Sequence, residues 1–167
     1  MILEQFYPKE WLESTYEIPW DQWYGKGIRG VIFDIDNTLV PHGEPADARA
    51  LELFEKFHEM GMNTCLLSNN KETRVASFAA QVDSPYIYKA GKPSVKNYYR
   101  AMKIMGTTKS QTLFVGDQLF TDVYGANRAG IYGILVKPIH PKEEIQIVLK
   151  RYLEAIVLYF YKKQQGK

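Results

Sequence analysis

The stretch VIFDIDNTL, residues 31–39, begins with three apolar side chains and runs directly into an aspartate. A continuous apolar run of this kind is typical of a strand that is buried on both faces of a parallel sheet. Further strands are predicted at 64–67, 86–88, 112–115 and 131–136, alternating with helices predicted at 46–60, 73–81, 93–105 and 120–129. Pro93 is expected at the first helical position of its segment. The alternation predicts an α/β fold, a Rossmann-like three-layer parallel sheet with helices on both faces.

Polar residues stand where the predicted strands end. Asp34 follows the first strand, Ser68 follows the second, and Asp117 follows the fourth, while the third strand runs into a segment that ends at Lys92. Ligands of open parallel sheets bind beyond the carboxyl ends of the strands. One edge of this sheet is therefore expected to gather carboxylates, a hydroxyl and an ammonium group.

The pair Asp34 and Asp36 at the exit of a strand can divide the work of a reaction, because one carboxylate can attack while the other handles protons. Asp117 and Asp122 can complete an oxygen-ligand site for Mg²⁺, which is bound through carboxylates, waters and substrate phosphate oxygens. Without a cation, the four carboxylates would repel one another. The cluster therefore predicts a magnesium site.

A phosphate beside those carboxylates needs positive and hydrogen-bonding partners. Lys92 supplies a compact charge, and the segment from Ser68 through Asn69 to Asn70 offers a hydroxyl and backbone N–H groups near a predicted helix N-terminus. Thr38 can also contact the phosphate. Each of these residues alone could be a helix cap, a turn residue or a solvated charge. Agreement between residue type and position at four strand ends favours catalysis.

The same residues resemble the motifs of the haloacid dehalogenase-like (HAD) phosphohydrolases. The stretch FDIDNTL at 33–39 is similar to the DxDxT signature of that superfamily, and the remaining motifs follow in order over about residues 28–137. These motifs are Ser68, then Lys92 with Pro93, then Gly116 and Asp117 with Asp122. Four motifs in order are far more specific than any one of them.

This resemblance implies a role for each residue. Asp34 would be the nucleophile that becomes an aspartyl phosphate, and it would also bind Mg²⁺. Asp36 would protonate the leaving oxygen, later activate water, and give the metal its backbone carbonyl. The implied phosphate-binding residues are Ser68 and Lys92, and the further metal ligands are Asp117 and Asp122. An acid at position 36 is typical of phosphatases rather than dehalogenases in this superfamily.

The segments between the motifs are short, so no cap domain is expected, and the open site could admit a phosphate on a large body. The missing cap, the motif DIDNTL, the segment GKP at 91–93 and the approach through 27–30 resemble the bacterial YqeG family in subfamily IIIA of the HAD proteins. That family is related to the mitochondrial phosphatidylglycerophosphate phosphatases. The resemblance implies a hydrolase of phosphoric monoesters with a role in phospholipid metabolism.

Composition limits the classes of partner and compartment. The 167 residues are 46% hydrophobic and 24% charged, with a net charge of +2, so no nucleic-acid partner is expected. The single Cys65 excludes an intramolecular disulfide and fits a reducing compartment. No secretory signal or membrane-spanning run is recognised. A cytoplasmic protein is expected, with peripheral contact to a membrane if the substrate is a lipid.

We expect one HAD-like domain over residues 1–167, with an aromatic N-terminal segment at 1–27, a catalytic core at 28–137 and a C-terminal helix at 141–163. The aromatic rings of the first segment could cap the core, face a partner or face a membrane interface. The C-terminal helix could pack on the sheet, contact a second subunit or lie in a membrane surface. Its sequence leaves these alternatives open.

Two other functions compete with a lipid phosphatase. A phosphoprotein or nucleotide phosphatase would use the same chemistry on another leaving group. A non-enzymatic module would keep the HAD fold and bind a protein partner through the site or the aromatic segment. The filled catalytic positions argue against the module.

Overall fold

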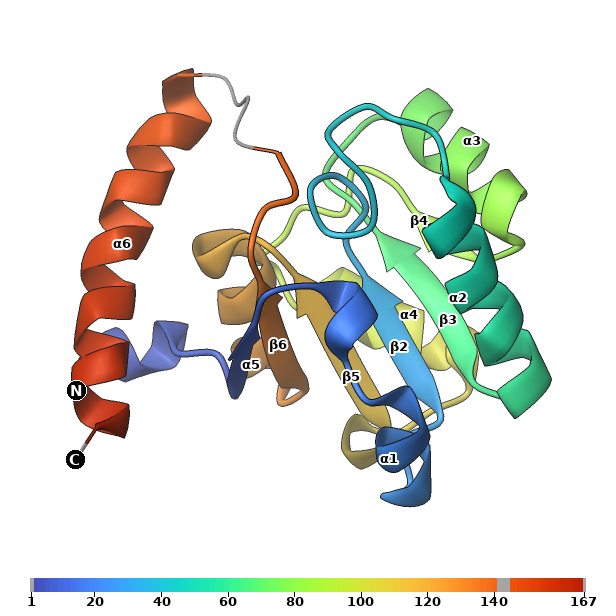
Figure 1. Ribbon diagram of the computed structural model, residues 1–167, viewed down its shortest axis with the longest axis horizontal. Coiled ribbons are helices and arrows are strands. Elements are labelled where there is room, and N and C mark those ends of the chain that lie inside the picture. Colours follow the sequence, from blue (N-terminus) through green and yellow to red (C-terminus); the bar gives the residue numbers. More distant parts are fainter. Residues whose placement is uncertain (1, 141–144, 167) are drawn as a thin grey trace.

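The computed structural model describes residues 2–140 and 145–166, with side chains over 2–140 and 148–166. Its centre is a six-stranded sheet in the order β1-β6-β5-β2-β3-β4, and every neighbouring pair is parallel (Figure 1). The strands are β1 (Glu10–Leu12), β2 (Gly30–Phe33), β3 (Asn63–Leu67), β4 (Tyr86–Ile87), β5 (Thr112–Gly116) and β6 (Tyr132–Val136). The predicted parallel α/β sheet is confirmed.

Helices cover both faces of the sheet. The first three pack with the apolar side chains of one face, and the paler ribbons of α4 and α5 lie behind the other (Figure 1). The helices are α1 (Trp20–Gly25), α2 (Ala48–Met60), α3 (Glu72–Val82), α4 (Lys96–Met105), α5 (Tyr124–Ala129) and α6 (Ile145–Gln165). Between Asp34 and Lys92 the chain forms only a loop, α2, β3, α3 and β4, so no cap domain is inserted there.

The aromatic side chains form much of the core. Trp20 from the N-terminal segment is buried, and its ring lies 4.8 Å from Phe57 and 5.8 Å from Phe33, centroid to centroid. Phe33 on β2 also packs on Phe54 and Phe57 of α2. Buried aromatic pairs add contact energy to their area burial. For Trp20, the structure confirms the core-capping alternative.

The N-terminal segment also contributes β1, which the sequence analysis did not predict. Glu10, Trp11 and Leu12 pair with Ile134, Leu135 and Val136 at the edge of the sheet. The three residues of β1 are too few to show an apolar run or an alternation in the sequence, and all three are only partly buried. Tertiary pairing with β6 makes this segment a strand.

One expectation about helices was wrong, and another is confirmed with a different first turn. Pro93 is not in the first turn of a helix: it follows a cis peptide bond with Lys92, and α4 begins at Lys96. The segment predicted as a helix at 120–129 is helical, but it begins with a π-helical turn, η4 (Leu119–Val123), which leads directly into α5. Asp122 lies in that turn. π-Helical turns are rare and are found most often at functional sites.

Helix α6 lies along the side of the molecule next to β1 and η4 (Figure 1). Its Val157 is buried with Leu119, Val123 and Leu135, and Leu158 packs on the same cluster. The structure extends this helix to Gln165, whereas residues 141–144 of the predicted helix lie outside the described residues. Among the helices that the structure describes, none is both long enough and apolar enough to span a bilayer.

Candidate active site

The carboxyl edge of the sheet brings together the polar residues that follow β2, β3 and β5. Parallel pairing of β2 with both β3 and β5 sets their carboxyl ends side by side. The side chains gathered there are all buried, with exposures of 7% or less: Asp34, Thr38, Ser68, Lys92, Asp117 and Asp122. Burying so much charge is unfavourable unless the charged groups are paired. The partners of each group therefore indicate which charges are compensated within the site.

Lys92 lies between two carboxylates. Its Nζ is 2.6 Å from Asp122 Oδ1 and 3.2 Å from Asp34 Oδ1. Burial favours the neutral amine, but Asp122 and Asp34 outweigh it and raise the pKa of Lys92, so the ammonium stays charged. Burial, followed by repulsion from Asp122, raises the pKa of Asp34 well above its ordinary value. The single positive charge of Lys92 therefore does not neutralise the carboxylates of this cluster.

Asp117 is held by two other segments. Its Oδ1 accepts a hydrogen bond of 3.1 Å from the Thr38 hydroxyl, and its Oδ2 accepts one of 2.6 Å from Arg151 Nη2. Burial and the charge of Asp122 raise the pKa of Asp117 to about 6, against the opposing effect of Arg151. Because this pKa of about 6 still lies below neutral pH, Asp117 remains mostly ionised there and adds to the excess negative charge of the cluster.

Three of these carboxylates have the geometry of a cation site. Asp34, Asp117 and Asp122 each offer an oxygen, and these atoms all lie within 4.8 Å of one another. Oxygen donors with net negative charge suit a hard divalent cation. The residues present therefore fit Mg²⁺. The side chain of Asp36 is not part of this group.

The Asp36 carboxylate faces a different set of partners. It accepts hydrogen bonds from Gly43 N at 2.8 Å and from Arg74 Nη2 at 3.0 Å, and His42 Nδ1 lies 3.9 Å away. Although burial opposes it, the hydrogen bond from Gly43 and the Arg74 guanidinium lower the pKa of Asp36. This geometry holds Asp36 ionised, as a base requires. Arg74 was missed in the sequence, because its position 38 residues beyond Asp36 matches no recognised spacing.

The predicted phosphate-binding residues have separate partners: Thr38 contacts Asp117, Ser68 contacts Asn70, and Asn69 contacts Lys92. The Ser68 hydroxyl accepts a hydrogen bond from Asn70 N at 3.1 Å, at the turn that leads into α3. The Asn69 amide is bonded to the backbone of Lys92, with Oδ1 2.9 Å from Lys92 N and Nδ2 3.3 Å from Lys92 O. Asn69 therefore fixes the segment that carries the ammonium.

The π-helical turn positions Asp122 over the end of β5. Asp122 Oδ2 accepts a hydrogen bond from Gln118 N at 3.0 Å, and the Tyr98 hydroxyl donates to the Asp122 carbonyl at 3.0 Å. A Cβ at Gly116 would lie only 2.5 Å from Asp122 Cγ, so a larger residue there would displace the carboxylate. Steric crowding by Asp122 thus explains why the motif has a glycine at position 116.

The C-terminal helix reaches the site through a pair that the sequence analysis also missed. Arg151 Nη1 donates to the Asp117 carbonyl at 2.6 Å and to Glu154 Oε2 at 3.0 Å, and Glu154 Oε1 accepts from Leu119 N at 3.0 Å. Opposite charges three residues apart in a mostly apolar stretch were the available signal. The pair clamps the segment after β5 onto α6.

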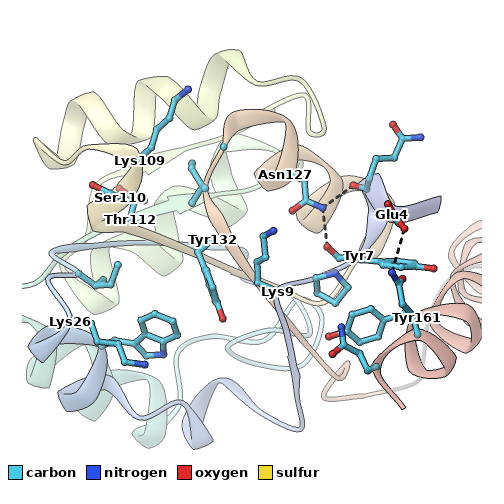
Figure 2. Close-up of a pocket in the computed structure, with 18 residues that line it drawn as sticks. Glu4, Tyr7, Lys9, Lys26, Lys109, Ser110, Thr112, Asn127, Tyr132 and Tyr161 are labelled. Atoms are coloured by element: carbon cyan, nitrogen blue, oxygen red, sulfur yellow. Dashed lines mark hydrogen bonds between the residues drawn. The ribbon is translucent and has the colours of Figure 1, made fainter. Parts of the chain in front are cut away.

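A wide cavity of about 960 Å³ lies elsewhere, at the amino ends of β5 and β6 (Figure 2). It is lined by Thr112 and Tyr132 but by none of the predicted site residues. Its lysines Lys9, Lys26 and Lys109 are spread apart in Figure 2 rather than directed at one point. Size alone does not make it the active site, because the paired and perturbed charges lie at the other edge.

Comparison with known proteins identifies phosphatases among the relatives. The sequence profile of a family described as HAD-hydrolase-like matches residues 89–144. The chain is 36% identical over 165 residues to a Bacillus subtilis (strain 168) protein named "Probable phosphatase YqeG", covering 98% of this chain and 96% of that one. It is 28% identical to phosphatidylglycerophosphate phosphatase 1 of Arabidopsis thaliana, covering 84% of this chain and 44% of that longer protein.

A solved structure supports the fold. The cobalt-bound deoxy-D-mannose-octulosonate 8-phosphate phosphatase of Haemophilus influenzae matches 68% of this chain and 80% of its own, with a TM-score of 0.52. The sequence identity is 15%, so this likeness concerns the architecture alone.

The cation site predicts a pH-dependent stabilisation by Mg²⁺. In the presence of a chelator, the Asp117 carboxyl group binds its proton more tightly in the folded protein than in the unfolded protein. This proton binding stabilises the fold fully below the unfolded-state pKa of 3.8, and the stabilisation is lost as the pH rises through the folded-state pKa of about 6. A cation replaces that proton, so the increase in melting temperature caused by Mg²⁺ should grow across this range. Calorimetry of wild type and Asp117→Asn checks this. An equal Mg²⁺ effect in both proteins would contradict the assignment.

The clamp predicts a large effect of Arg151→Met, which leaves Asp117 and Glu154 buried without their cation. Urea unfolding in chelator, at a pH above the Asp117 pKa of about 6, should show a loss of about 3 kcal/mol. The matched control is Lys56→Met, which breaks the exposed Lys56–Asp21 pair of 2.8 Å and should cost about 0–1 kcal/mol. Equal losses in the two variants would show that Arg151 is only a surface partner.

Proposed function

Because the chain belongs to the HAD-like hydrolases, in the family of the YqeG phosphatase, we propose that it hydrolyses phosphoric monoesters with Mg²⁺ through an aspartyl phosphate on Asp34. One observation carries this proposal. Asp34, Asp117 and Asp122 bring three buried carboxylate oxygens within 4.8 Å of one another, with the Lys92 ammonium against two of these carboxylates. Attack on a phosphate by a carboxylate needs this kind of charge compensation.

In the proposed first step, an Asp34 oxygen attacks phosphorus and the bond from phosphorus to the ester oxygen breaks. Asp36 gives its proton to the leaving oxygen. The structure holds Asp36 ionised through Gly43 and Arg74, and an incoming phosphate dianion would raise its pKa by repulsion. The substrate itself thus favours the protonated acid that the step requires.

In the second step, a water oxygen attacks phosphorus while Asp36 takes the water proton. The bond between phosphorus and Asp34 breaks, which returns the Asp34 carboxylate and releases phosphate. Each cycle consumes one water and leaves Asp36 protonated for the next leaving group. Here the ionised Asp36 that the structure favours is the state that serves as a base.

Other residues bind rather than react. We assign Asp34, Asp117, Asp122 and the Asp36 carbonyl as the Mg²⁺ ligands. A bound Mg²⁺ would supply charge compensation for the phosphoryl oxygens and favour the ionised form of Asp34. Lys92, Ser68 and Thr38 are proposed to bind the phosphate oxygens, and Asn69 fixes the Lys92 backbone.

The proposed substrate class is a lipid phosphomonoester such as phosphatidylglycerophosphate. Two curated relatives that act on this lipid by name are 28% and 27% identical to the chain. The missing cap supports the idea, because an uncovered site can receive a phosphate that stands on a surface.

A substrate panel with Mg²⁺ tests this proposal. We expect phosphatidylglycerophosphate in mixed micelles to give a kcat/KM at least about tenfold above glycerol phosphate, a nucleoside monophosphate or a phosphoserine peptide, since remote lipid contacts lower the barrier. Phosphate release is the measurement, and Asp34→Asn, which keeps the side-chain size and removes the charge, is the background.

The outcomes separate the alternatives. Preference for the nucleotide or the peptide would contradict the lipid assignment and keep the phosphatase chemistry. Turnover by Asp34→Asn at the wild-type rate would contradict the chemistry. No turnover of any substrate, together with a stable protein partner, would favour the binding module.

A further inference from the structure

Helix α6 lies along the side of the molecule (Figure 1). Its two faces differ in the exposure of their side chains. One face bears Glu154, Val157 and Tyr161, which are buried against the rest of the protein. The other bears large apolar side chains that are 39–73% exposed: Val148, Leu149, Tyr152, Leu153, Ile156, Tyr159 and Phe160. Their spacing places them on one stripe of the helix, which we call the α6 outer face. Apolar patches of this kind mark interaction sites.

The helix cannot turn the outer face inward. Arg151 and Glu154 are bonded to Asp117 and Leu119, and Val157 is fixed in the cluster with Leu135. Rotation would break the buried ion pairs and empty that cluster. The outer face is therefore held away from the core and stays accessible to a partner.

The charges of α6 indicate what covers it. Its only acidic residue is Glu154, which is buried on the opposite face, whereas Lys163 is exposed at the C-terminal end of the stripe. Lys162 lies over the Trp11 ring at 4.7 Å from its centroid. The outer face of a second copy would offer Lys163 no acidic partner. An anionic surface would complement its charge.

We propose that the α6 outer face docks on the surface of an anionic lipid bilayer, with its rings and aliphatic side chains at the level of the headgroups. This deepens the proposed function and rests on it for the reason to visit a membrane. Tyr152, Tyr159 and Phe160 are of the type that favours the interface between lipid and water. The helix would lie in the plane of the interface rather than cross it.

A groove beside the outer face extends toward the proposed cation site. A groove of about 410 Å³ runs between α6 and the edge of the sheet, with Tyr159 and Leu158 on one wall and Trp11 on the other. Asp117 and Arg151 belong to the same lining. The lining of this groove thus includes both Tyr159 of the outer face and Asp117 of the proposed cation site.

Vesicle binding without substrate tests the inference separately from activity. The protein is sedimented with vesicles of phosphatidylcholine alone and with vesicles that also contain phosphatidylglycerol. We expect binding to the anionic vesicles that weakens as salt is raised. The variant Leu153→Gln/Ile156→Gln should lower the partition coefficient by about tenfold or more, since two apolar contacts with the lipid are lost.

The matched control is Leu51→Gln/Ile104→Gln, which makes the same two changes at exposed positions on α2 and α4. It should bind vesicles as wild type does. Thermal unfolding of both variants near the wild-type temperature shows that any loss of binding is not a loss of fold.

Equal effects of the two variants, or no binding to anionic vesicles at low salt, would overturn the inference. A dimer in sedimentation velocity that only the α6 variant dissociates, with no vesicle binding, would assign the face to a second copy instead. Vesicle binding that persists when the substrate panel shows no lipid preference would support the docking surface while the proposed substrate fails.

Discussion

The ammonium of Lys92, 2.6 Å from Asp122 and 3.2 Å from Asp34, is the contact on which the site depends. It allows two carboxylates to be buried beside each other, yet Asp117 adds a third negative group within 4.8 Å. The remaining charge is met by Arg151 from α6 and by the raised pKa values of Asp34 and Asp117. A site with such an excess of negative charge binds protons or cations.

The fold keeps these like charges together because each is attached to a rigid element. Asp34 and Asp117 follow β2 and β5, which are hydrogen-bonded neighbours at the centre of the sheet. Asp122 is fixed by the π-helical turn over Gly116 and by the Tyr98 hydroxyl beneath it. The Arg151–Glu154 clamp then ties this turn to α6. Packing and charge pairing therefore support one another at this edge.

Much of this arrangement could be predicted from the sequence, because strand ends in a parallel sheet meet at one edge whatever the loops do. Asp34, Ser68 and Asp117 are brought together for that reason. Partners set by tertiary contact were not predictable in this way: Arg74 and Arg151 stand at no fixed spacing from the motifs, and β1 depends on β6. The predicted position of Pro93 in the first turn of a helix was wrong. The chain around Lys92 follows a non-helical path there, and α4 begins only at Lys96.

The central claim is that Asp34 carries the phosphoryl group. It is tested by acid-quenching a single turnover of a labelled phosphomonoester and locating the label by mass spectrometry. The account predicts an acid-stable, alkali-labile phosphate on Asp34. Release of phosphate in a single turnover with no labelled protein, or a label on another residue, would contradict it.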